Sequence, residues 1–117
     1  YLKNKLIAIA GNHKYVGDVR GIGLMIGIEF VQNKLTKEPF PPEIQFAQKV
    51  KKALFKENVF IEASNGCNKG MSGDMIMVAP AFIINYKQLD DLVSRIDNAL
   101  FAVEKQMFNN VQKISST

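Results

Sequence analysis

The sequence predicts an α+β fold, in which a small, mostly antiparallel sheet of three or four strands carries helices on one face as a two-layer sandwich. Short apolar runs rich in strand-forming residues occupy positions 24–31 and 74–80. Near the C-terminus, apolar residues recur at spacings of three and four, as on one face of a helix. These are Leu89, Leu92, Val93, Ile96, Leu100, Val103 and Met107. Helices that cover one face of the sheet would bury all these apolar residues together.

Size and charge limit the possible functions. The chain has 117 residues, which suits one domain, and a net charge of +4 from 15 basic and 11 acidic residues. The basic residues form no cluster, so we expect neither nucleic acid nor a membrane as partner. Lys49, Lys51 and Lys52 fall on a predicted helix and are assigned to its solvated face. A single cysteine and the lack of a secretory or membrane-spanning apolar run favour a cytoplasmic location.

The first ten residues predict a helix. Leu2, Leu6 and Ile9 share one face, and Gly11 is suited to end it. Neither a start methionine nor a capping residue precedes Tyr1, so we expect the helix to begin within a longer chain. We place one domain at residues 1–108 and a polar, frayed tail at residues 109–117.

Residues 18–31 predict a β-hairpin. Asp18 to Arg20 and residues 24–31 are extended in character, and Gly21 to Gly23 would form a tight turn between them. The glycines approach the G-x-G-x-x-G pattern of dinucleotide-binding loops. That pattern binds a phosphate only where a helix follows the glycines, and a strand is predicted here instead.

The remaining elements follow in order. A polar connector with three prolines covers residues 32–42, and a helix whose first turn contains Pro42 runs to about Asn58. A short strand at 59–61 leads into a loop at 62–73, and a second strand runs from 74 to 80. Asn85 and Gln88 then form a capping-box pattern that opens the last helix.

Few residues have the chemistry of a catalytic or metal site. His13 has no second ligand at a suitable spacing, so a surface position is favoured over a metal or catalytic role. Cys67 lies near Lys69 in the predicted loop, but no histidine lies nearby to activate it. Asp18, Arg20 and Glu29 flank the hairpin and are predicted to form structural ion pairs. From the residues alone, therefore, we expect no catalytic group and no metal site.

Three segments resemble the C-terminal domain of class III pyridoxal-phosphate-dependent aminotransferases, of fold type I and subgroup II. Residues 16–30 are similar to the pattern VGDVRGxGLMxGIE. Residues 70–84 are similar to the segment GD…APPFIIT, and a helix follows it at residues 88–93. Residues 37–42 resemble a loop of one branch of the family. The order and spacing agree over about residues 2–105.

The resemblance implies the C-terminal small domain of an enzyme that transfers an amino group from an amine or ω-amino acid to a 2-oxo acid. A class III relative acting as racemase, decarboxylase or aminomutase is the alternative, and a non-enzymatic α+β binding module is another. In the family, the Schiff-base lysine and phosphate-binding residues lie in the large domain and in the partner subunit of a homodimer. The resemblance thus implies that this segment alone binds no pyridoxal phosphate, is inactive, and forms a wall on the substrate side.

One position departs from the family pattern. Many members carry an arginine shortly before the Gly-Asp pair, where its guanidinium group binds the substrate carboxylate. Here Gly70 occupies that position, preceded by Asn68 and Lys69. We therefore assign these three residues to a substrate-side loop, in which Lys69 supplies a point charge without the two-pronged geometry of arginine.

Overall fold

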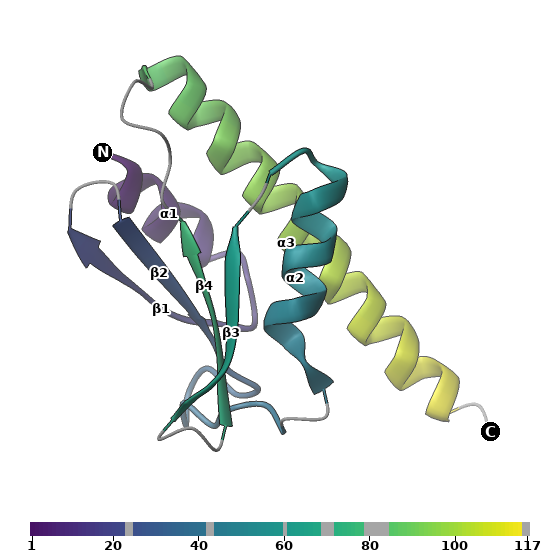
Figure 1. The fold of residues 1–117 in the computed structure, drawn as a ribbon. Coiled ribbons are helices and arrows are strands. Elements are labelled where there is room, and N and C mark those ends of the chain that lie inside the picture. Colours follow the sequence, from purple (N-terminus) through teal and green to yellow (C-terminus); the bar gives the residue numbers. More distant parts are fainter. Residues whose placement is uncertain (23–24, 42–43, 60, 69–71, 79–84, 116–117) are drawn as a thin grey trace.

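The computed structural model describes residues 1–22, 25–41, 44–59, 61–68, 72–78 and 85–115. They form, in order, α1 (Leu2–Ala10), β1 (Val16–Ile22), β2 (Met25–Phe30), α2 (Phe46–Lys56), β3 (Glu62–Asn68), β4 (Ser72–Val78) and α3 (Tyr86–Ser115). The four strands form one sheet in the order β1-β2-β4-β3, and all neighbouring strands are antiparallel. This confirms the predicted α+β fold (Figure 1).

The core lies on one face of the sheet. Along β2, Ile26, Ile28 and Phe30 are buried, and Ile28 lies opposite Ile76 of β4. Residues at alternate positions of a strand point to the same face, so these side chains all point toward the helices. They pack in one cluster with buried residues of α1, α2 and α3, among them Leu6, Val50, Leu54, Ile96 and Val103.

Helix α3 determines the length of the molecule. It has 30 residues, and at 1.5 Å per residue it extends about 45 Å. The longest dimension of the protein is 50 Å. Figure 1 shows α3 running diagonally past α1 and α2, and it packs on both. Within the described residues, none of the helices is both long and apolar enough to cross a membrane.

The start of α3 agrees with the predicted capping box. The Asn85 side chain accepts a hydrogen bond from the Gln88 backbone N–H at 2.8 Å, and the Gln88 side chain accepts one from the Asn85 N–H at 3.0 Å. The end of α3 differs from the prediction, because the helix continues to Ser115 where a frayed tail was expected at 109–117. In the sequence, Val111 and Ile114 follow Met107 at spacings of four and three residues, which is typical of a continuing helix. The domain limits at 1 and 108 stay a prediction.

The predicted loop at residues 62–73 is wrong. Residues 62–68 form β3, an edge strand paired with β4. A short strand was expected at 59–61, but residues 59 and 61, which the structure describes, are not in a strand. The stretch contains asparagine and glycine, which disfavour strands, so its composition by itself predicts a loop. A shift of register between Asn65 and Asn68 accommodates Gly66 and Cys67 within the ladder.

Helix α2 begins later than predicted, at Phe46. Its capping residue Gln45 has a left-handed backbone (φ 51°) and forms no side-chain capping bond. Asp74 of β4 replaces that cap, because its carboxylate accepts the backbone N–H of Ala47 at 3.1 Å. The start of α2 is therefore fixed by a residue 27 positions further along the chain.

Candidate functional site

The face of the sheet opposite the helices carries three of the predicted site residues, Asp18, Arg20 and Glu29. Directly opposite residues of paired strands share a face, so the register gives the composition of this surface. One row across the four strands contains Asp18, Glu29, Met75 and Ser64, and the next contains Arg20, Gly27, Met77 and Glu62. We call this surface, together with Met25, the open face. It faces away from the core and is available to a ligand or to another part of the protein.

An ion-pair network lies on the β1–β2 side of the open face. The guanidinium of Arg20 lies 3.3 Å from the Asp18 carboxylate and 3.0 Å from that of Glu29. The Arg20 and Asp18 side chains are about half exposed, at 52% and 51%. The predicted ion pairs are thus present in the structure. Because two carboxylates already occupy Arg20, binding a substrate carboxylate there would require exchange of partners.

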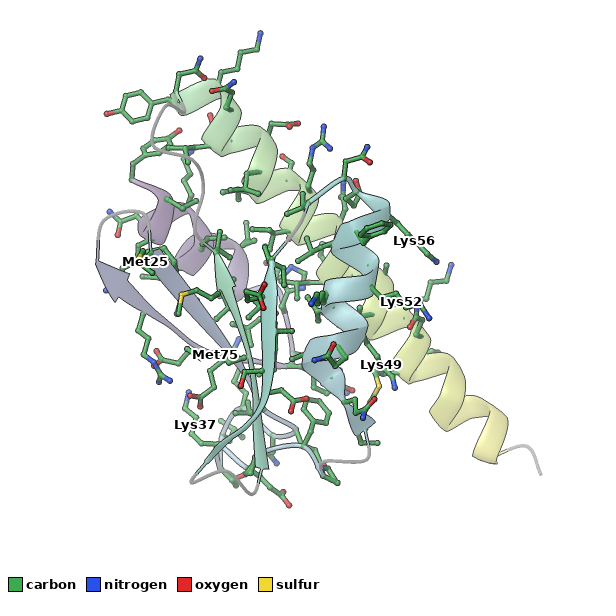
Figure 2. The ribbon with its side chains drawn as sticks, in the orientation of Figure 1. Met25, Lys37, Lys49, Lys52, Lys56 and Met75 are labelled. Atoms are coloured by element: carbon green, nitrogen blue, oxygen red, sulfur yellow. The ribbon has the colours of Figure 1, made fainter. Side chains whose placement is uncertain are left out.

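The centre of the open face is flat and apolar. A Cβ atom on Gly27 would lie 2.4 Å from the terminal methyl of Met75, so the Met75 side chain lies across the space that a larger residue would fill. Met25, on the same strand as Gly27, is 61% exposed. Figure 2 shows both methionine side chains on the sheet. The open face therefore combines a thioether patch with a charged border.

The predicted substrate-side loop is only partly described. Asn68 ends β3 and pairs with Ser72 of β4, so the two strands bring the ends of the connection together. Lys69 and Gly70 lie outside the described residues, as does Gly23 of the predicted hairpin turn. The predicted turn is wrong at Gly21 and Ile22, because β1 continues to Ile22 and Gly21 pairs with Ile26 inside the ladder.

The surface position predicted for His13 is wrong. The imidazole is fully buried, with Nδ1 at 2.5 Å from Glu104 and Nε2 at 2.6 Å from Asp97, both on α3. Its ring lies against Phe101, with centroids 4.4 Å apart. Each ring nitrogen thus has its own carboxylate partner on α3. No local pattern in the sequence indicates the burial of His13, because its partners Asp97 and Glu104 are 84 and 91 residues away.

The His13 cluster is suited to structure and not to metal binding, because both of its nitrogens are already occupied. Within the described part of the chain, no group of three or more histidine, cysteine or acidic side chains could hold a metal ion. Cys67 contributes its backbone to β3, which removes it from the loop in which a reactive thiol was considered.

A pyridoxal phosphate site needs a lysine that is desolvated and aligned with the cofactor. Among the lysines whose side chains the structure describes, each side chain is at least partly exposed. Lys34 and Lys37 bind backbone carbonyls, at Ala10 and His13 and at Gly17 respectively. These described lysines therefore lack the desolvated setting that a Schiff base with this cofactor needs.

The family follows from comparison with known proteins. The family model described as aminotransferase class-III matches residues 1–100. The chain belongs to the class III aminotransferase family. The four-stranded sheet with three helices is similar to a solved transaminase from the marine bacterium Virgibacillus, at 35% identity and a TM-score of 0.84. That match covers 91% of this chain and 23% of the transaminase.

Similar class III aminotransferases come from several kingdoms. An uncharacterized aminotransferase of Schizosaccharomyces pombe is 37% identical over 86% of this chain and 22% of its own length. The uncharacterized aminotransferase YodT of Bacillus subtilis is 35% identical over 91% of this chain and 24% of its own length. The chloroplastic gamma aminobutyrate transaminase 3 of Solanum lycopersicum is 31% identical over 86% of this chain and 17% of its own length. The chain thus spans about a quarter or less of the relatives it matches.

Proposed function

We propose that this chain is the C-terminal small domain of a pyridoxal-phosphate-dependent class III aminotransferase that transfers an amino group from an amine or ω-amino acid to a 2-oxo acid. The observation that carries the proposal is the family match over residues 1–100. Relatives named for gamma aminobutyrate and a similar omega-transaminase from Thermomicrobium roseum support an ω-amino donor.

In this proposal the domain contributes a surface, and the chemistry occurs elsewhere. The open face and the connection after Asn68 form a wall on the substrate side of a cofactor held by a large domain and by the second subunit of a homodimer. Support comes from the exposed lysines, none of which has the desolvated setting of a Schiff base in the described residues. The single cysteine supports a reducing, cytoplasmic location. Relatives named as mitochondrial and chloroplastic show that the family itself does not determine location.

Spectroscopy on the whole gene product that contains this chain tests the proposal. We expect an absorption band of bound pyridoxal phosphate at the edge of the visible range, which an amino donor bleaches and a 2-oxo acid restores. With a ¹⁵N-labelled donor, the label should appear in the amino acid formed from the 2-oxo acid. A protein that binds no pyridoxal phosphate, or that converts the donor without a 2-oxo acid, would contradict the proposal. The second result would identify a racemase, decarboxylase or aminomutase.

A further inference from the structure

A hollow of about 390 Å³ lies between α2 and α3, away from the open face. Helix α2 and its end supply Lys49, Lys52, Ala53, Lys56 and Glu57, and α3 supplies Ala99, Ala102 and Gln106. Figure 2 shows the three lysines following one another along α2. Lys51 and Lys52 are exposed and Lys49 is partly exposed, in agreement with the predicted solvated face. Lys49 and Lys52 also line this hollow, whereas Lys51 does not.

Two of the three lysine side chains, those of Lys52 and Lys56, carry positive charge without a partner among the described residues. The three lysines are spaced by three and four residues, a spacing at which like charges on a helix destabilise it. Lys49 donates to the Ile44 carbonyl at 2.8 Å. The side chains of Lys52 and Lys56 form no hydrogen bond or ion pair with any residue that the structure describes. Glu57 is the one acidic residue of the lining, so the hollow has an excess of positive charge.

Three alanines contribute apolar surface to the hollow. Ala53, Ala99 and Ala102 present methyl groups, and Ala99 is buried in the core. These short side chains leave the space open between the two helices. Its volume lies near the lower end of the roughly 300 to 1,000 Å³ typical of small-molecule sites. The lining therefore fits a small ligand with a carbon chain on the alanines and acidic groups at the lysines.

We propose that this hollow binds a small organic dianion, with two acidic groups joined by a short carbon chain. The helical rise places Lys49 and Lys52 about 4.5 Å apart along the axis, and Lys52 and Lys56 about 6 Å apart. Two acidic groups at that separation can each contact a different pair of ammonium groups. The acidic groups are carboxylates or phosphates, both of which lysine binds as a point charge. The proposal is independent of the aminotransferase reaction.

Lysine footprinting on the whole gene product tests the location directly. Glutarate is added at increasing concentration, exposed lysines are acetylated, and the extent of acetylation at each lysine is measured by mass spectrometry. We expect saturable protection of Lys49, Lys52 and Lys56, with Lys51 unchanged as an internal control on the same helix. Butyrate, which has one carboxylate, should protect them at least about tenfold more weakly, because one charge-assisted contact is lost. Equal protection by butyrate, or equal protection of Lys51, would overturn the proposal.

Charge-reversal variants test the same site by calorimetry. Lys52→Glu should weaken glutarate binding by about tenfold or more. The matched control Lys51→Glu changes the net charge equally but lies outside the hollow, so its affinity should stay within about twofold. 3-Phosphonopropanoate, which carries a phosphonate in place of one carboxylate, shows which acidic group is preferred, and a loss with Lys52→Glu supports the site in either case. Identical binding by both variants would show that the anion binds elsewhere, including at a substrate site, and would overturn the proposal.

Discussion

His13 joins the N-terminal part of the chain to α3. Its partners Asp97 and Glu104 are themselves largely buried, with side chains 29% and 19% exposed. Lys34 donates to the His13 carbonyl at 3.0 Å, so the backbone at this position is held as well. Removal of the imidazole would leave two partly buried carboxylates without their hydrogen-bond partner.

We expect His13→Ala to lower the free energy of unfolding by about 3 kcal/mol at neutral pH. Urea unfolding measures this value, and Lys14→Ala at the exposed neighbouring position is the control. In a background of Asp97→Asn and Glu104→Gln, the same substitution should be clearly less costly. An equal loss in both backgrounds would show that contact with Phe101, and not charge, is what His13 contributes.

Asp74 is buried at the start of α2, and burial raises the pKa of its carboxyl above the ordinary value. Hydrogen bonds from the backbone N–H groups of Ala47 and Phe46, and the charge of Lys49, oppose this shift. A carboxyl whose pKa is raised by folding binds its proton more tightly in the folded state. Its contribution to stability is therefore full below the unfolded pKa and is lost as the pH rises through the folded pKa.

We expect Asp74→Ala to reduce the free energy of unfolding by about 2 kcal/mol, because the N–H groups at the start of α2 lose their acceptor. Asp74→Asn keeps an acceptor and should change stability by less than about 1 kcal/mol. Relative to the Asn variant, the wild-type protein should lose stability as the pH is raised from about 4 to 7. A difference that does not change with pH would contradict the raised pKa.

The β1–β2 hairpin was predicted correctly because its signals are local. Extended residues on both sides of a glycine-rich segment are close in sequence, so no distant contact is needed to recognise the pair. Strand β3 was missed because its residues favour a loop, and its pairing with β4 outweighs that preference. Among the candidate site residues, the ion pairs of Arg20 could be predicted because the hairpin brings Asp18, Arg20 and Glu29 together. The burial of His13 could not be predicted, because its partners lie on the distant helix α3.

Gly21 shows why the hairpin needs glycine at one position. Its φ is +144°, and a Cβ atom would lie 2.1 Å from the Met25 carbonyl oxygen. Gly21→Ala should therefore lower the free energy of unfolding by about 2 kcal/mol or more. Gly11→Ala is the matched control, because its φ is −61° and the nearest atom would be 3.8 Å away. If thermal unfolding shows equal stability for both variants, the hairpin backbone tolerates a side chain and this reading is wrong.

One core joins the sheet to all three helices. Phe46 lies at its centre, with ring centroids 4.6 Å from Phe40, 5.0 Å from Phe30 and 5.3 Å from Tyr15. These aromatic residues come from β2, α2 and the connections between elements. Loss of one ring should thus weaken the whole domain and not one element.

We expect Phe46→Ala to lower the free energy of unfolding by about 4 kcal/mol, since a large cavity would remain. Leu35→Ala is the control, because Leu35 is 95% exposed and its removal should change stability by less than about 0.5 kcal/mol. Near- and far-ultraviolet circular dichroism should show one common transition. Two separate transitions would mean that the sheet and helices unfold independently.

The sequence by itself determined the fold class, the hairpin, the capping box and the resemblance to class III aminotransferases, because periodicity, turn residues and motifs are properties of neighbouring residues. Tertiary structure alone decided that His13 is buried between two carboxylates, that Asp74 caps α2, and that three lysines line a hollow against α3. Each of these arrangements joins residues that are distant in sequence. Contacts of that kind depend on how the elements pack, and no local pattern records them.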